Sequence, residues 1–225
     1  MKDIKAIKGK FYIQRLIEEG EHEHQDFKFS ISDARKIARS VSAFANNDGG
    51  RLLVGVKDNG NIAGVRNEED IYVIEQAAAM YCRPAQKVEF TAFKTEGGAV
   101  VIRAEIARAT HRPVQAQEPD GTWRSYYRVK DENIVAPDLM VRAWRKKESQ
   151  KGALLSFSDA ESGLISLLEE NKMITIEEFM KAARISRHTA EDIIVKLYAV
   201  GVIDFTYTGT TFKIVPNPQL PQNIF

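Results

Sequence analysis

The sequence has very little cysteine and no long apolar segment, and each shortage excludes a class of protein. Cys82 is the only cysteine among the 225 residues, so no disulfide can form within the chain, which suits a reducing cytoplasm. No run of about 18 apolar residues occurs, so we expect neither a membrane-spanning helix nor a membrane partner. The first residues are basic but lack the apolar stretch of a secretory signal. These features predict a cytoplasmic location.

The chain also lacks an overall excess of positive charge, with 32 Lys and Arg against 31 Asp and Glu. Residues 1–150 carry 25 basic against 22 acidic side chains, whereas residues 151–225 carry 7 against 9. Proteins that bind nucleic acid usually show a basic footprint, because neutralising phosphates supplies much of the affinity. Any contact with nucleic acid must therefore come from a local basic patch.

A Gly-x-x-x-x-Gly-Lys-Ser/Thr loop is absent, so ATP binding is not expected. The segment Asn47-Asp48-Gly49-Gly50 offers backbone N–H groups that suit a phosphate. Asn46, Gly49 and Gly50 are therefore candidates for a phosphate-binding loop. The simpler interpretation is that the glycines permit a tight turn from a helix into a strand.

The residue pattern divides the chain into two domains, which together give an α+β fold. Residues 1–145 alternate strand-like and helix-like segments, which predicts a mixed α/β domain. Residues 158–216 read helix, helix, helix, hairpin, which is the order of a winged helix-turn-helix. Residues 146–157 are expected to form a linker, and residues 217–225 a loose tail.

Two local patterns in the first domain make specific structural predictions. In the strand predicted at residues 25–30, Phe27 and Phe29 should point inward, with Asp26 and Lys28 outward. Further along, Asn59-Gly60 predicts a type I′ hairpin turn, followed by a returning strand at residues 62–65.

Several segments of the first domain together resemble one known family. They are Gly20-Glu21, Asp26-Phe27-Lys28, the run Ser42 to Gly50, and Gly55-Val56-Lys57-Asp58. Over residues 7–140 this combination resembles the Schlafen AlbA-like domain, which was formerly grouped as divergent AAA. The specific part of the match is the run that ends at Gly50 together with the Gly-Val-x-Asp segment. The resemblance implies a mixed α/β fold. Bacterial members often carry a C-terminal winged helix, so it also implies a DNA-binding transcriptional regulator.

The same resemblance implies a second function, because some animal Schlafens are metal-dependent RNA nucleases that use three carboxylates. On the matching positions these carboxylates are Glu21, Asp26 and Asp58, which would hold Mg²⁺ or Mn²⁺, while Lys28 would bind the scissile phosphate or the attacking water. Strand alternation puts Glu21 on the opposite face from Asp26 unless the chain bends between them. Asp26 is also shorter than the glutamate of the family. The sequence therefore favours a binding protein over an enzyme, with a metal-dependent endoribonuclease-like hydrolase of RNA or DNA as the alternative.

Three groups of basic residues are candidates for contact with nucleic acid. One flanks the family motif, one interleaves with aromatic residues near Trp123 as a single-strand stacking surface would, and one opens the predicted recognition helix. In chain order, the candidates are Lys28, Arg35, Lys36, Arg39, Arg51, Arg124, Arg128, Arg187 and His188.

The second domain leaves two roles open. Arg187 and His188 are placed to face a major groove, but Glu191 and Asp192 follow them and the domain is net acidic. Winged helices also serve as dimerisation surfaces. The sequence thus predicts a nucleic-acid-binding protein that prefers DNA to RNA, forms a homodimer and needs no cofactor outside the nuclease alternative. An adaptor that only mediates protein contacts is a further alternative.

Overall fold

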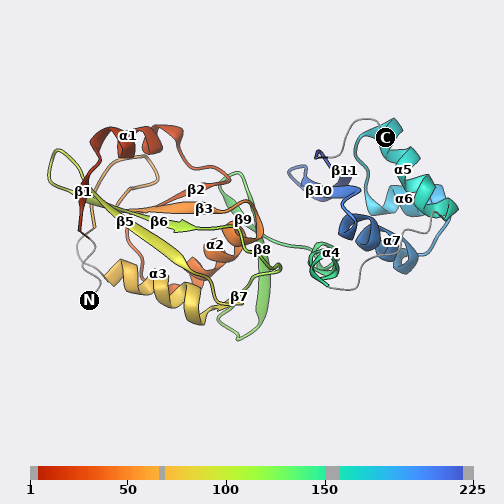
Figure 1. The fold of residues 1–225 in the computed structure, drawn as a ribbon, viewed down its shortest axis with the longest axis horizontal. Coiled ribbons are helices and arrows are strands. Elements are labelled where there is room, and N and C mark those ends of the chain that lie inside the picture. The colour runs from red at the N-terminus through yellow and green to blue at the C-terminus, as the bar shows by residue number, and fades with distance from the viewer. Residues whose placement is uncertain (1–4, 66–68, 150–157, 220–225) are drawn as a thin grey trace. The chain divides into compact units, whose positions relative to one another are not determined.

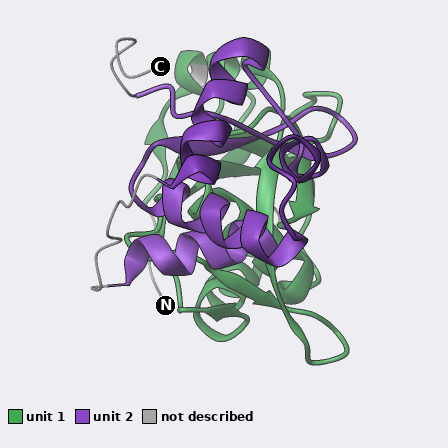
Figure 2. Ribbon diagram, turned by 90° about the vertical axis from the view of Figure 1, so that its right-hand side faces the viewer, with its two compact units in different colours: residues 1–136 green, residues 137–225 purple. Residues whose placement is uncertain are grey.

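The chain consists of two compact units in the computed structural model, which describes residues 5–65, 69–149 and 158–219. Unit 1 spans Met1–Ala136 and unit 2 spans Pro137–Phe225 (Figure 2). Within the described ranges, no helix combines the length and the apolar character needed to cross a membrane. Most of the linker and of the tail expected from the sequence lies outside these ranges.

A five-stranded mixed sheet forms the centre of unit 1 (Figure 1). Its strands are β1 (Ile7–Lys8), β2 (Gln25–Lys28), β3 (Gly50–Val54), β5 (Val88–Lys94) and β6 (Val100–Ile106). The order across the sheet is β1-β5-β6-β3-β2, with β1 parallel to β5, β2 parallel to β3, and antiparallel pairing elsewhere. β2 is therefore an edge strand of this sheet.

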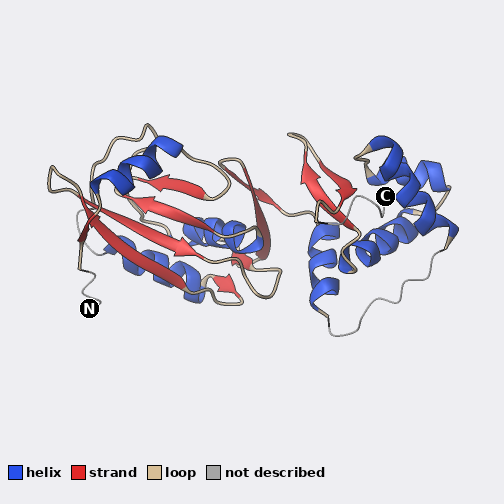
Figure 3. Cartoon of the chain, turned by 45° about the horizontal axis from the view of Figure 1, so that its top comes forward, coloured by secondary structure: helices blue, strands red, loops and turns tan. Residues whose placement is uncertain are grey.

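Helices cover both faces of the five-stranded sheet (Figure 3). They are α1 (Lys10–Glu19) on one face, and α2 (Ala34–Asn46) and α3 (Glu69–Met80) on the other. Adjacent residues of β3 show the alternation, because Leu53 packs with α1 whereas Leu52 packs in the core under α2 and α3. Burial on both faces explains why β3 and the residues after it are almost continuously apolar.

The alternation predicted for residues 25–30 holds only in part. Phe27 is 2 % exposed, as expected, but Phe29 is 43 % exposed because β2 ends at Lys28 and the chain bends there. Asp26, predicted to face outward, is 4 % exposed because Arg128 covers it.

A second sheet of four antiparallel strands packs against α2. Its strands, in spatial order, are β4 (Cys82–Arg83), β7 (Gln115–Gln117), β8 (Trp123–Val129) and β9 (Glu132–Val135). All four contact α2. The turn at Pro119-Asp120-Gly121 predicts the β7–β8 pair, but the short strands β4 and β9 have no periodic pattern to predict them.

Two asparagines at the end of α2 fasten this helix to its surroundings. The buried Asn46 Nδ2 donates to the carbonyl oxygens of Val114 at 2.8 Å and Tyr126 at 2.9 Å, while its Oδ1 accepts the Val114 N–H at 2.8 Å. Asn47 does the same with Arg128, donating to its carbonyl oxygen at 2.8 Å and accepting its N–H at 3.1 Å. Each asparagine side chain bonds backbone groups as a neighbouring strand would, so the end of α2 is held at a fixed position along β8.

The hairpin after β3 differs from the predicted one in two ways. Gly60 has a φ of 81°, but Asn59 is not among the described residues with positive φ, so the turn is not type I′. In the described chain, the returning segment forms no strand: it has an isolated bridge between Val56 and Ile62, and the Ala63 and Gly64 N–H groups both donate to the Gly55 carbonyl oxygen at 2.9 Å. Gly55 explains the difference, because its φ of 91° bends the chain at the end of β3.

Unit 2 contains helices followed by a hairpin. Its described elements are α4 (Asp138–Glu148), α5 (Asp159–Asn171), α6 (Ile176–Ala183), α7 (Arg187–Ala199), β10 (Ile203–Tyr207) and β11 (Phe212–Pro216). Capping boxes at Ser158 and Thr175 open α5 and α6, and Ile174 forms a bridge to Ile214 of β11. The sequence places residues up to 145, and so most of α4, in the first domain. In the structure α4 packs against α7 in unit 2, with Trp144 buried.

Candidate functional site

A cluster of charged side chains lies at β2, the edge strand of the five-stranded sheet. Asp26 Oδ2 lies 2.7 Å from Lys28 Nζ, and Asp26 Oδ1 lies 3.3 Å from Arg128 Nη2. Arg128 comes from β8, is 1 % exposed and lies over the ring of Phe44. A guanidinium buried this deeply needs a counter-charge, so Asp26 serves as the structural partner of Arg128.

Glu21 joins this cluster because the chain turns back before β2. His22 and Gln25 exchange backbone hydrogen bonds of 3.0 and 3.1 Å, and this bend brings Glu21 to the side of Asp26. Glu21 Oε1 accepts the Phe27 N–H at 2.8 Å. Burial, followed by the hydrogen bond and negative charge of Asp26, raises the pKa of Glu21, although the Phe27 amide acts in the opposite direction. Two of the three carboxylates implied by the resemblance therefore meet.

The charged cluster also occupies backbone groups on the open edge of β2. Such an edge leaves N–H and C=O groups that can pair with a strand of another chain. The Phe27 N–H is taken by Glu21, and its carbonyl oxygen accepts Lys28 Nζ at 2.8 Å. The Gln25 carbonyl oxygen accepts Arg128 Nη2 at 3.3 Å. The acids and bases of the family motif thus close this edge of the sheet.

Asp58, the third carboxylate of the implied metal site, lies in the exposed turn after β3. Across the three described ranges, no group of three or more His, Cys, Asp or Glu side chains is arranged to hold a metal. Asp26 already contacts Lys28 and Arg128, and Glu21 already accepts an amide. Mg²⁺ and Mn²⁺ need several converging oxygen ligands, so this arrangement does not fit the three-carboxylate site.

Replacing Glu21 with glutamine should remove a pH-dependent loss of stability. Because folding raises the pKa of Glu21 above its ordinary 4.5, its contribution to stability is complete below that pH and is lost as the pH rises through the folded-state pKa. The amide keeps an acceptor for the Phe27 N–H and a donor for Asp26, without titrating. The free energy of unfolding of Glu21→Gln should therefore not fall over this interval.

Urea unfolding of the wild type and of Glu21→Gln at a series of pH values measures how each free energy of unfolding changes. The series begins at pH 4.5, the ordinary pKa of Glu21, and goes upward. Glu18→Gln, at an exposed position of α1, is the matched control and should follow the wild-type profile. An equal fall in the wild type and in Glu21→Gln would contradict the prediction.

Asn46, Gly49 and Gly50, the candidates for a phosphate-binding loop, already contact other parts of unit 1. The Asn46 side chain is bonded to Val114 and Tyr126, as described above. Gly49 has a φ of 81°, and its N–H donates to the Phe44 carbonyl oxygen at 3.0 Å. A Cβ on Gly50 would lie 2.2 Å from the ring of Phe44. These contacts favour the tight helix-to-strand turn over a phosphate cradle.

Arg39 and Arg51, two more of the predicted basic residues, already hold acidic partners. Arg39 pairs with the buried Glu118 through two nitrogens, with Nε 3.1 Å from Oε1. Burial alone would raise the pKa of Glu118, but hydrogen bonds from Tyr126 and Arg39 outweigh it and lower that pKa. Arg51 Nη2 lies 2.6 Å from Glu19 Oε2. Both arginines hold elements of unit 1 together.

Arg35, Lys36 and Arg124 form no ion pair in the described chain. The structure shows a further exposed base, Arg83, which is not among the candidates from the sequence. Arg83 of β4 is exposed and lies 4.6 Å from the ring centroid of Trp123 in β8. Nothing in the sequence around Arg83 indicates this contact, because only the β4–β7–β8 pairing creates it.

A second arginine stacks on Tyr81, which lies two residues before Arg83 in the chain. Arg35 of α2 lies 4.8 Å from the ring centroid of Tyr81, which precedes β4. Arg124 follows Trp123 on β8 and is exposed. Because successive side chains of a strand alternate, Trp123 and Arg124 lie on opposite faces of the second sheet. We call Arg35, Tyr81, Arg83, Trp123 and Arg124 together the arginine–aromatic surface, which includes both faces.

Arg187 and His188, the candidates in unit 2, are exposed at the start of α7 but are paired. Arg187 Nε lies 3.1 Å from Glu191 Oε1, and His188 Nδ1 lies 3.0 Å from Asp192 Oδ2. Arg142 of α4 contacts the same two acids at 2.6 and 2.7 Å. The acids that follow in α7 therefore hold the bases that were predicted to face a groove.

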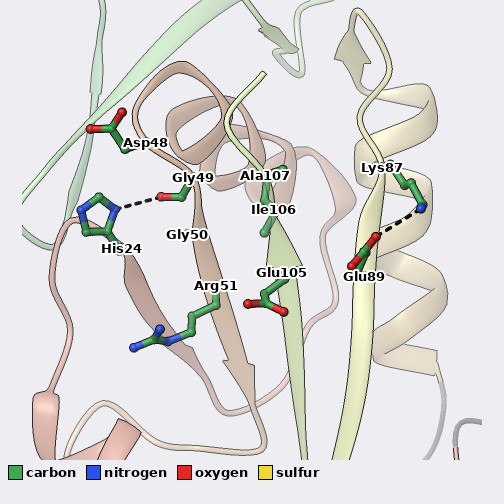
Figure 4. A pocket seen from close by; sticks show the side chains of 10 residues that line it. All are labelled: His24, Asp48, Gly49, Gly50, Arg51, Lys87, Glu89, Glu105, Ile106 and Ala107. Carbon is green, nitrogen blue, oxygen red and sulfur yellow. Dashed lines mark hydrogen bonds and ion pairs between the residues drawn. The ribbon is translucent and has the colours of Figure 1, made fainter. Parts of the chain in front are cut away.

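An open pocket of about 470 Å³ lies where β2 and β3 begin and β6 ends (Figure 4). His24 Nδ1 is 3.0 Å from the Gly49 carbonyl oxygen on one side, and Lys87 pairs with Glu89 at 3.2 Å on the other. Charges of both signs line the pocket, so its electrostatics favour neither an anion nor a cation.

Comparison with protein families matches residues 21–137, or 117 of the 225 residues, to the family described as Schlafen, AlbA_2. The chain belongs to the Schlafen AlbA_2 family. The match confirms the resemblance found in the sequence and suggests a function related to nucleic acid. It begins at Glu21, includes the charged cluster and both stacked arginines, and ends at the first residue of unit 2.

Among solved structures, the chain is similar to the DIP2311 protein of Corynebacterium diphtheriae, with 19 % sequence identity and a TM-score of 0.44. The similarity covers 87 % of this chain and 34 % of the other, so the chain spans about a third of that protein. No curated protein matches the chain.

Proposed function

We propose that the protein binds nucleic acid through unit 1, prefers DNA to RNA, and acts as a transcriptional regulator. The family supports a function related to nucleic acid. The arginine–aromatic surface is the observation that carries the proposal, because it combines cations for phosphates with aromatic rings for bases.

The geometry of this surface suits contact with a phosphate backbone. A guanidinium stacked on an aromatic ring loses side-chain freedom before binding, yet its N–H groups stay in the plane and remain able to donate to phosphate oxygens. Arg83 and Arg124 are exposed and hold no acid in an ion pair in the described part of unit 1, so a phosphate displaces no existing pair. By contrast, Lys28, Arg39, Arg51 and Arg128 would each have to leave a carboxylate.

For unit 2 we propose a winged helix that mediates homodimerisation. Three helices followed by a hairpin, together with the bridge from Ile174 to Ile214, support the winged-helix assignment. The pairing of Arg187 and His188 with acids of α7 supports protein contact over groove reading. Sedimentation equilibrium tests the dimer, and a monomer at all concentrations would contradict it.

Removing one exposed cation of the arginine–aromatic surface should weaken binding to every nucleic acid sequence. Arg83→Ala and Arg124→Ala should each lower the affinity roughly threefold to tenfold, and each should reduce the slope of log affinity against log salt by about 1. Fluorescence anisotropy with labelled DNA and RNA across a salt series measures both quantities. Arg187→Ala, also exposed but paired and located in unit 2, should change the affinity less than about twofold.

Two results would overturn the proposed function. One is the absence of binding to any DNA or RNA at low salt. The other is unchanged binding in both Arg83→Ala and Arg124→Ala. Cleavage of the labelled strands in Mn²⁺, abolished by Asp58→Asn at its exposed position, would instead support the nuclease alternative.

A further inference from the structure

Phe29 is a large apolar side chain that the core of unit 1 does not use. Its ring is 43 % exposed at the bend where β2 ends, although its partner in the sequence pattern, Phe27, is buried. The residues beside it are charged: Lys28 precedes it, and the exposed Lys57 and Asp58 lie in the turn after β3. An apolar ring within charged surroundings is not part of an apolar protein-docking patch, which is larger and contiguous.

The parallel pairing of β2 and β3 places Phe29 beside Lys57. Parallel strands end at the same edge of a sheet, where loops can build a binding site. Here the Gly55 N–H donates to the Lys28 carbonyl oxygen at 2.8 Å, which joins the two strand ends directly. Lys57 Nζ then lies 5.4 Å from the ring centroid of Phe29. In the part of unit 1 that the structure describes, Lys57 forms no ion pair, so its charge is not neutralised by a carboxylate.

We propose that Phe29 and Lys57 form a platform for an unpaired base of single-stranded nucleic acid, with Lys57 binding the neighbouring phosphate. The inference rests on the proposed function and adds the form of the ligand. An exposed ring can stack on a base only where that base has a free face, which a base inside a duplex lacks. The Lys57 ammonium group lies over the ring, 5.4 Å from its centroid, which puts a positive charge near the phosphates of a base stacked on the ring. The platform therefore selects single strands, or the unpaired end or loop of a longer molecule.

The experiment compares two forms of one ligand. A fluorescein-labelled DNA strand of mixed sequence is titrated with the full-length protein, alone and after annealing to its complement. Phe29→Ala should lower the affinity for the single strand about fivefold to fiftyfold and for the duplex less than about twofold, because stacking on a base is lost only in the first. Lys57→Ala should reduce the salt slope for the single strand by about 1.

A matched control is available on α1. Phe11 is 82 % exposed, so Phe11→Ala makes the same chemical change on a different element and should alter neither affinity by more than about twofold. Circular dichroism and urea unfolding show whether the variants remain folded, which the exposure of both rings predicts.

The outcomes separate the platform from the proposed function. Equal single-strand affinity of the wild type and Phe29→Ala would overturn the platform while leaving nucleic-acid binding intact. An equal loss for single strand and duplex would also overturn it, because a backbone contact would then be responsible. If the wild type binds neither form at low salt, the proposed function itself fails.

Discussion

Replacing Asn46 with alanine is expected to lower the free energy of unfolding of unit 1 by about 3–5 kcal/mol, one of the two largest effects predicted for the chain. The side chain is fully buried and bonds the backbone N–H and carbonyl of Val114 and the carbonyl of Tyr126. Alanine would leave the Val114 N–H and the Tyr126 carbonyl oxygen without partners, whereas the Val114 carbonyl oxygen would keep the Ser42 hydroxyl at 2.9 Å. Each buried group without a partner costs about 1–3 kcal/mol. Total stabilities of domains are about 5–15 kcal/mol, so much of the reserve would be lost.

The two tryptophans allow this loss to be assigned to one unit. Trp123 lies in unit 1 and Trp144 in unit 2, and the sequence contains no other. In a Trp144→Phe background, fluorescence during urea unfolding reports on unit 1 alone. Asn59→Ala is the control, because Asn59 is exposed in a turn and, among the described residues, its side chain bonds only the Asn61 N–H; it should cost less than about 1 kcal/mol. If Asn46→Ala lowers the free energy of unfolding by less than about 1 kcal/mol, the hydrogen bonds of Asn46 are not needed to stabilise unit 1.

Replacing Asp26 with alanine is expected to destabilise unit 1 by about 3–5 kcal/mol, because it leaves the charge of Arg128 buried without its carboxylate. Within the described residues, the guanidinium of Arg128 would keep only the oxygens of Asn133 and Gln25 as hydrogen-bond partners, at 3.0 and 3.3 Å. The same fluorescence experiment applies, since Trp123 and Arg128 lie on the same strand.

Two further variants show whether the buried charge is the cause. Asp58→Ala removes a carboxylate of the same family motif at an exposed position and should change the free energy of unfolding by less than about 0.5 kcal/mol. Combining Asp26→Ala with Arg128→Met removes both charges and should recover part of the loss. If the double variant is no more stable than Asp26→Ala, an unpaired Arg128 is not the reason for the loss.

Local patterns predicted the elements of both units where the signal lies within a few neighbouring residues. Asp33 caps α2, and the capping boxes at Ser158 and Thr175 open α5 and α6, because a cap involves residues only two or three apart. The family motif named Glu21 and Asp26, which meet at β2, but it also named Asp58, which lies in the exposed turn after β3. The same reasoning failed at Phe29, because alternation says nothing about where a strand ends.

The contacts that decide the candidate site are far apart in the sequence. Asp26 and Arg128 are separated by about half the chain, and no local pattern indicates that the Arg128 side chain of β8 reaches β2. Arg83 meets Trp123 only because β4 joins the second sheet through β7. The bend at His22 that brings Glu21 to Asp26 depends on backbone hydrogen bonds, which composition does not reveal. Such pairings follow from the tertiary fold and need the structure.

The strand β8 has a consequence for how a ligand is recognised. It presents Trp123 and Arg124 on the surface at one end and anchors Arg128 in the interior, four residues and roughly 13 Å further along. The side chain of Asn46 holds it between these points, at Tyr126, and that of Asn47 holds it at Arg128. A ligand therefore meets a surface that is already rigid, so the entropy lost on binding falls mainly on the nucleic acid. Selectivity then depends on how readily the ligand adopts the shape that this surface requires.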